Sequence, residues 1–217
     1  MIRPKIKICC ITSRADLKTA LDAGVDALGF VSKMPSGPGV ISDAEIRDLA
    51  HYAPKSVISF LLTSLTDPWQ IISQIEYCGT NAVQLCNYVG IEDLPEIRNS
   101  LPGVKVMNVI HVNTYDEVAL AKMYAKNSDY LLLDSGKPNA DVQILGGSGM
   151  THNWNISAEI VENSKVPVWL AGGLNAENVK EAIAKVKPYG IDICSGVRKN
   201  GALDAGLLKE YLAQVGK

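Results

Sequence analysis

The chain has 217 residues, 47% hydrophobic and 20% charged, a composition that excludes disordered, collagen-like and disulfide-scaffold proteins. Its 21 basic and 23 acidic residues leave a net charge of -2, which argues against binding to nucleic acid or to an anionic membrane surface. No apolar run is long enough to span a bilayer, and the N-terminus lacks a signal-peptide pattern, so we expect a cytoplasmic protein.

Short apolar runs alternate with longer amphipathic stretches along the whole chain. Ser42 and Glu45 form a capping-box pattern at the start of one stretch, and Thr12 and Ser13 are cap candidates for another. The predicted strands are 5–11, 26–31, 56–62, 82–85, 104–110, 130–133, 166–170 and 191–194. The predicted helices are 16–23, one that starts at 42, then 67–78, 94–99, 115–126, 156–163, 175–186 and 204–214, with Asn175 as a further cap.

Eight strands, each followed by a helix, predict a (β/α)₈ barrel in one α/β domain that covers residues 1–217. Parallel strands are buried on both faces, which explains why the runs are continuously apolar rather than alternating. The alternative fold is a doubly wound open sheet, which shows the same alternation of strands and helices but usually has fewer strands. The chain carries no dinucleotide fingerprint that would favour this alternative.

The five cysteines are expected to be free thiols. Their number is odd, so they cannot all pair, and their spacings fit no metal signature. They are Cys9, Cys10, Cys78, Cys86 and Cys194. We therefore predict no metal site and no disulfide framework.

In a barrel of this kind the functional residues lie at the C-terminal ends of the strands. Three small-residue clusters follow the last three predicted strands, and they predict a phosphate site because glycine lets backbone N–H groups approach an anion closely. Each cluster alone would suit a tight turn. The residues assigned to the phosphate are Gly147, Gly172, Gly173, Ser195 and Gly196.

Two further strand ends carry candidate acid and base groups. Asp134 follows an apolar strand directly, where partial burial would raise its pKa and make it a proton donor; capping of the loop is the alternative. Cys9 ends the first strand, either as a packing residue or as a thiolate base.

Several segments resemble, in chain order, the motifs of the phosphoribosylanthranilate isomerase family of tryptophan biosynthesis. KICCIT resembles its KICGIT, GVDALGFV its GADALGFVF, and AVQL its AVQLHG. LLLD, followed by GGSG and a tryptophan, resembles LLLD followed by GGTG…FDW. LAGGLNAENVKEAI is similar to SGGLNPENVxxAI, and IDICSGVRKNGALD resembles VDVSSGVExxPGxKD.

The resemblance implies a cofactor-free barrel that catalyses an Amadori rearrangement, an internal aldose-to-ketose shift of N-(5′-phosphoribosyl)anthranilate. By position in the motifs, Cys9 is implied as the base and Asp134 as the acid. The implied partner is a small phosphorylated sugar-amine substrate, with no nucleic acid and no membrane. We expect a monomer or a homodimer.

The sequence also departs from the family pattern around the amine half of the substrate. The family's loop arginine, which holds the anthranilate carboxylate, falls where this chain has Pro38, Gly39 and Val40. Lys33 or Arg198 is the candidate replacement. Cys86 stands in place of the histidine of AVQLHG, and Cys10 in place of the glycine of KICG.

Three hypotheses therefore stay open. The first is phosphoribosylanthranilate isomerisation, and the second is the same rearrangement of another N-phosphoribosyl amine. The third is a non-catalytic protein that binds a phosphorylated sugar. Retention of Cys9 and Asp134 argues against the third, because neither group is needed to hold phosphate.

Overall fold

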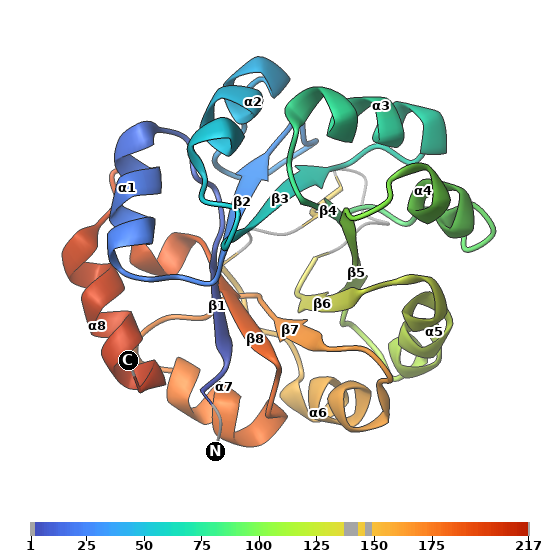
Figure 1. Cartoon of the computed structure of the whole chain (residues 1–217). Coiled ribbons are helices and arrows are strands. Elements are labelled where there is room, and N and C mark those ends of the chain that lie inside the picture. Colours follow the sequence, from blue (N-terminus) through green and yellow to red (C-terminus); the bar gives the residue numbers. More distant parts are fainter. Residues whose placement is uncertain (1–2, 137–142, 146–148, 217) are drawn as a thin grey trace.

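Eight parallel strands close into a barrel in the computed structural model, which describes residues 3–136, 143–145 and 149–216 (Figure 1). Strand β1 pairs with β2 on one side and with β8 on the other, so the sheet has no free edge. The predicted (β/α)₈ barrel is confirmed, and the open doubly wound sheet is excluded. The strands are β1 (Lys5–Ile8), β2 (Ala27–Val31), β3 (Ile58–Thr63), β4 (Ala82–Leu85), β5 (Lys105–His111), β6 (Tyr130–Asp134), β7 (Val168–Leu170) and β8 (Gly190–Ile193).

The helices form a ring around the barrel (Figure 1). They are α1 (Arg14–Asp22), α2 (Asp43–Tyr52), α3 (Pro68–Cys78), α4 (Leu94–Ser100), α5 (Asp116–Tyr124), α6 (Trp154–Asn163), α7 (Val179–Val186) and α8 (Ala205–Val215). Two short 3₁₀ turns, η1 (Ala125–Asn127) and η2 (Ser195–Val197), and a small hairpin of β9 (Arg198–Lys199) and β10 (Ala202–Leu203) complete the elements. The sequence patterns did not predict this hairpin.

Local capping signals account for most helix starts. The Ser13 hydroxyl accepts from the Asp16 N–H at 3.1 Å, and Ser42 forms the predicted capping box with Glu45. The predicted start of α7 at residue 175 is wrong. The Asn175 side chain accepts instead from the N–H groups of residues 177 and 178, which makes a separate turn before the helix.

Two apolar layers stabilise the barrel. One lies between the strands and the surrounding helices, and the other fills the interior of the barrel. Trp169 is fully buried in the inner layer and packs edge-on against Phe60, with ring centroids 6.5 Å apart. A Cβ on Gly190 would lie 2.4 Å from the Trp169 ring, so the glycine makes room for the indole. The inner layer therefore fills the lower part of the barrel, and a pocket opens at the C-terminal ends of the strands.

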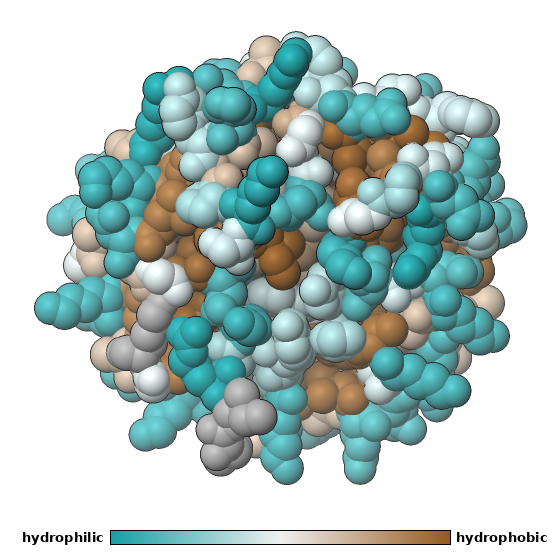
Figure 2. All heavy atoms as spheres, viewed as in Figure 1, coloured by the Kyte–Doolittle hydropathy of each residue, from teal (hydrophilic) through white to brown (hydrophobic). Residues whose placement is uncertain are grey.

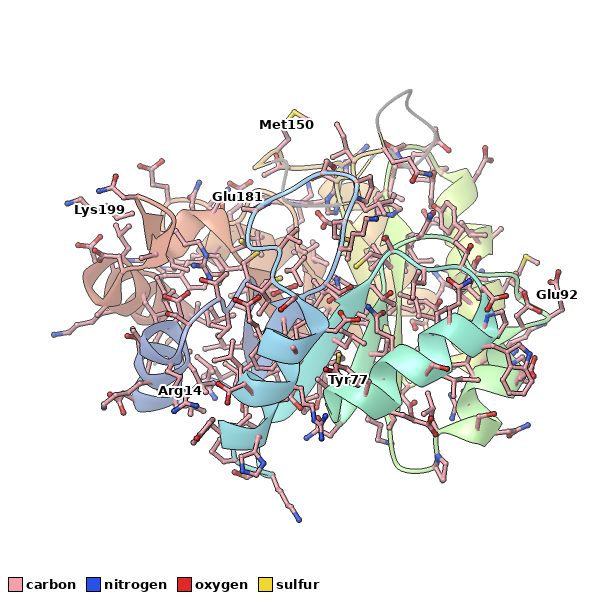
Figure 3. The ribbon with its side chains drawn as sticks, turned by 90° about the horizontal axis from the view of Figure 1, so that it is seen from above. Arg14, Tyr77, Glu92, Met150, Glu181 and Lys199 are labelled. Atoms are coloured by element: carbon pink, nitrogen blue, oxygen red, sulfur yellow. The ribbon has the colours of Figure 1, made fainter. Side chains whose placement is uncertain are left out.

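The outer surface is polar where the helices face solvent, with hydrophobic residues exposed mainly between them (Figure 2). No helix within the described residues is both long and apolar enough to cross a membrane. In Figure 3, Met150 from the loop after β6 stands at the top of the barrel, above Tyr77 near the end of α3. The strands' C-terminal ends lie on the Met150 side, and the candidate site is found there.

Candidate active site

A pocket opens among the C-terminal ends of the strands and encloses about 710 Å³, counting space open to solvent. Cys9 after β1 and Asp134 at the end of β6 both line it. Strands β7 and β8 separate the two, so the side chains enter from well-spaced parts of the rim.

Cys9 enters the pocket because β1 alternates its side chains. Ile6 and Ile8 pack toward the helices, while Lys7 and Cys9 point into the barrel, two residues apart on the same face. The sequence pattern predicted that this strand runs to residue 11, but β1 ends at Ile8. It ends early because Cys10 adopts a left-handed conformation with φ 62°. This turn brings the Cys10 sulfur to 3.7 Å from the Cys9 sulfur.

A buried ion pair lies directly below Cys9. Lys7 Nζ and Asp192 Oδ2 are 2.6 Å apart, and the lysine side chain is fully buried. Burial lowers the pKa of Lys7, but the Asp192 carboxylate outweighs it, so that the pKa is raised and the lysine stays charged. The second oxygen, Asp192 Oδ1, is buried without a hydrogen-bond partner in the described chain, and Asp192 lines the pocket.

Asp134 is held in a form that suits a proton donor. Burial raises its pKa from 3.8 to about 6, although hydrogen bonds from Ser135 oppose this shift. The Ser135 N–H lies 2.7 Å from Asp134 Oδ1, and its hydroxyl lies 3.4 Å away. The carboxyl group is therefore fixed in orientation and keeps a proton near neutral pH more readily than an exposed aspartate.

The glycine turn after β7 contributes the next part of the pocket. Gly172 and Gly173 both line it in left-handed conformations, with φ 80° and 61°. A Cβ on Gly173 would lie 2.6 Å from the carbonyl carbon of Met150, so only glycine fits there. Backbone N–H groups are thus the groups that this turn can offer a ligand.

The loop after β8 lies against this turn. Ser195 lines the pocket. Gly196 does not line it but packs behind, where an added Cβ would lie 2.5 Å from the Leu174 carbonyl oxygen. Gly147, the remaining residue predicted for phosphate, lies outside the described residues. Gly172, Gly173 and Ser195 therefore share the pocket with Cys9 and Asp134, and Gly196 supports the Ser195 loop.

The two candidate cations for a substrate carboxylate do not line the pocket. Lys33 is exposed, and its backbone carbonyl accepts from the Ser64 hydroxyl at 2.8 Å. The Arg198 side chain is only 7% exposed. Its guanidinium group is already engaged with protein groups, which makes the predicted substrate role unsuitable for Arg198.

The partners of Arg198 explain its actual place. Nη1 lies 3.3 Å from Asp16 Oδ2, and Nη2 donates to the carbonyl oxygens of Cys9 and Cys10, the former at 2.8 Å. Arg198 thus ties the loop after β8 to the loop after β1. It stabilises the backbone that carries Cys9 rather than presenting a charge to a ligand.

Sequence reasoning missed three residues of the site. Lys7 and Asp192 could have been found from strand alternation, since each lies two residues before a cysteine of the pocket rim. His152 had no such signal. Its Nε2 lies 2.7 Å from the Ser157 hydroxyl, and burial lowers its pKa to about 4, which keeps the ring neutral.

His152 faces the acid group across Gly172. A Cβ on Gly172 would lie 3.0 Å from Asp134 Oδ1 and 3.2 Å from His152 Nδ1, so both atoms border the same small space. His152 Nδ1 is buried without a hydrogen-bond partner in the described chain. The His152 ring therefore lies behind Gly172, beside the acid group, and is not among the residues that line the pocket.

The chain matches the family model described as N-(5'phosphoribosyl)anthranilate (PRA) isomerase over residues 6–214. An N-(5'-phosphoribosyl)anthranilate isomerase from Methanocella arvoryzae is 32% identical over 97% of both chains, and one from Natronomonas pharaonis is 33% identical over 98% of both. The crystal structure of phosphoribosyl anthranilate isomerase from Thermotoga maritima is 29% identical, with a TM-score of 0.83 over 98% of both chains. The chain therefore belongs to the N-(5'-phosphoribosyl)anthranilate isomerase family.

Proposed function

We propose that this protein isomerises N-(5'-phosphoribosyl)anthranilate to 1-(o-carboxyphenylamino)-1-deoxyribulose 5-phosphate, a reaction of tryptophan biosynthesis. One observation carries the proposal: a buried carboxyl group with a pKa of about 6 shares a pocket with the Cys9 thiol and a glycine turn. A solved phosphoribosyl anthranilate isomerase in complex with a reduced form of that product is 27% identical to this chain, with a TM-score of 0.81.

Asp134 begins the reaction as the general acid. It donates its proton to the ring oxygen of the ribose, the bond between that oxygen and C1 breaks, and the amine nitrogen stabilises the resulting iminium ion. Burial supports this step because it favours the protonated carboxyl group.

Cys9 continues the reaction as the general base. Its thiolate removes the proton from C2 of the opened sugar, and the enolamine that forms tautomerises to the ketone. Cys9 is among the groups that raise the pKa of Lys7, so the buried lysine two residues before it keeps its positive charge. The unpartnered Asp192 Oδ1 would accept a second sugar hydroxyl.

The phosphate group is assigned to the turn after β7 and the loop after β8. Gly172, Gly173 and Ser195 would bind it through backbone N–H groups, with Gly196 supporting the Ser195 loop, because no Lys or Arg among the described residues lines the pocket. Gly147 remains a predicted contributor outside the described residues.

The opposite side of the pocket favours a second candidate substrate. Met34, Pro38, Leu62 and Leu145 line it, and it carries no described cation to pair with an anthranilate carboxylate. A bidentate arginine–carboxylate pair contributes strongly to such recognition. Another N-phosphoribosyl amine that lacks the carboxylate would fit this apolar lining equally well.

The test is single-turnover and steady-state kinetics on N-(5'-phosphoribosyl)anthranilate, followed by its loss of fluorescence. Cys9→Ala and Asp134→Asn should each lower kcat by about 10²–10⁴-fold, the typical contribution of a general acid or base. Cys78→Ala is the matched control, since Cys78 is buried in α3, away from the pocket, and should keep wild-type turnover. Near wild-type kcat in both site variants would contradict the acid–base assignment.

The oligomeric state stays a prediction of a monomer or a homodimer. A relative from Thermotoga maritima is described as a dimeric phosphoribosylanthranilate isomerase from which monomers were generated. Sedimentation equilibrium of this chain would decide between the two states.

A further inference from the structure

Three thiols gather where β1 and β8 end. In the β1–β8 register Lys7 pairs with Asp192 and Ile8 with Ile193, so the next opposed positions are Cys9 and Cys194. The left-handed turn at Cys10 brings a third sulfur to the same place, 3.7 Å from that of Cys9. Cys10 and Cys194 are each the largest influence on the pKa of the other, which indicates that their thiols lie close together, and all three cysteines line the pocket.

Cys10 and Cys194 differ in exposure. Cys194 is partly exposed to the pocket, whereas Cys10 is only 5% exposed. The loop between β2 and α2 covers Cys10 so closely that a Cβ on Gly39 would lie 2.5 Å from Cys10 Cβ. A small reagent that enters the pocket therefore meets Cys194 more readily than Cys10.

The neighbours of the two thiols also make them chemically unequal. The neighbouring Cys10 thiol lowers the pKa of Cys194, and the Arg198 guanidinium lowers it further. The same contact raises the pKa of the Cys10 thiol. Cys194 is therefore the first of the pair to ionise, while Cys10 retains its proton.

We propose that Cys194 and Cys10 form a thiol oxidation site, at which a hydroperoxide converts the pair into a reversible disulfide. The Cys194 thiolate sulfur attacks one peroxide oxygen, the O–O bond breaks, and the departing hydroxide takes a proton to become water, which leaves a sulfenic acid. The Cys10 sulfur then loses its proton, bonds to the Cys194 sulfur and displaces the hydroxyl group as a second water molecule. Two thiols lose two electrons and two protons, and one hydrogen peroxide becomes two waters.

The disulfide changes the site on both sides. It draws the Cys10 sulfur away from the Cys9 sulfur and joins the loop after β1 to the loop that carries Ser195. Given the proposed function, the isomerase loses activity in proportion to the fraction of disulfide formed. A reducing dithiol restores it, since a disulfide, unlike a sulfinic acid, is reduced by thiol exchange.

The experiment treats the full chain with limiting hydrogen peroxide, blocks the remaining thiols by alkylation and maps tryptic peptides without reduction. We expect peptide 8–14, which holds Cys9 and Cys10, to be joined to peptide 186–198, which holds Cys194. The link should disappear with dithiothreitol. In a Cys9→Ser variant the same link should still form, because Cys10 is the assigned partner.

Further variants test the order of events. Cys194→Ser should slow thiol loss from peptide 8–14 by about ten-fold, because the more readily ionised sulfur of the Cys10–Cys194 pair is removed. Cys10→Gly should leave Cys194 as a sulfenic acid that dimedone traps. Cys78→Ser, which alters a buried thiol in α3 away from the pocket, should oxidise like the wild type.

Three results would overturn the assignment: a disulfide confined to peptide 8–14, a link that vanishes in Cys9→Ser, or an unchanged rate in Cys194→Ser. Because peptide mapping needs no turnover, these outcomes do not depend on whether the protein isomerises N-(5'-phosphoribosyl)anthranilate.

Discussion

Asp134→Asn is the most informative single change in this protein. Asparagine has the size of aspartate, and its carbonyl oxygen can still accept from the Ser135 N–H, now 2.7 Å from Asp134 Oδ1. The amide cannot donate an acidic proton. The variant therefore removes the proton while it preserves the local hydrogen bond.

The structure sets the expected magnitude. A pKa of about 6 leaves about one tenth of the enzyme with a protonated Asp134 at pH 7, roughly 150-fold more than an aspartate at 3.8 would. Loss of a general acid typically lowers kcat by about 10²–10⁴-fold, or roughly 3–5 kcal/mol of transition-state stabilisation. KM should change less, because proton transfer contributes to the transition state and not to substrate binding.

The assay is the pH dependence of kcat/KM from pH 5 to 9 for the wild type and the variant. Since the acid must be protonated, the wild-type rate should fall as the pH rises through about 6. Asp134→Asn should be slow at every pH and should lack this decline. A variant that retains the decline, or that turns over at the wild-type rate, would refute the assignment of Asp134 as the acid.

The same pKa makes a prediction about stability. Because the pKa of Asp134 is raised in the folded state, its ionisation costs stability as the pH rises through about 6, whereas the protonated form below pH 3.8 costs none. Removal of the charge should therefore stabilise the fold at pH 8 by up to about 3 kcal/mol. Thermal melts should show Asp134→Asn above wild type at pH 8, by about 2–4 °C per kcal/mol, and no gain near pH 3.5.

Three other substitutions test the supporting structure. Gly173→Ala should raise KM and lower Tm, since the added Cβ would lie 2.6 Å from backbone atoms. The control is Gly79→Ala, at a glycine with φ 68° and nothing within 4 Å of the added Cβ. It should lower the free energy of unfolding by only about 1–2 kcal/mol and leave KM unchanged. Lys7→Met should cost about 3–5 kcal/mol in urea denaturation by leaving Asp192 unpaired, and the double variant with Asp192→Leu should recover most of the loss; no recovery would deny the pairing. Arg198→Met should lower the free energy of unfolding most at neutral pH, and this loss should shrink as the pH falls through the lowered pKa of Asp16, its ion-pair partner. A loss of stability that does not depend on pH would exclude the ion pair as its cause.

The sequence alone determined the fold class and placed the two proposed reacting groups at one end of the barrel. The β–α alternation predicted all eight strands, and the strand predicted at residues 82–85 has those bounds in the structure. Such elements can be predicted because apolar runs and capping residues determine secondary structure through interactions between residues close in the chain. Cys9 and Asp134 were found for a related reason. Parallel strands place their C-terminal ends at one rim, so position along a strand already indicates position in the barrel.

Only the tertiary structure decided which polar groups pair with one another. Lys7 and Asp192 lie 185 positions apart in the chain, and Arg198 reaches Asp16 across 182. Such pairs depend on the register with which β8 closes against β1, and no local pattern encodes that register. A motif can therefore mark Arg198 as a charge near the site, but only the closed barrel shows that this charge is buried against the protein's own carboxylate and is not available to a substrate.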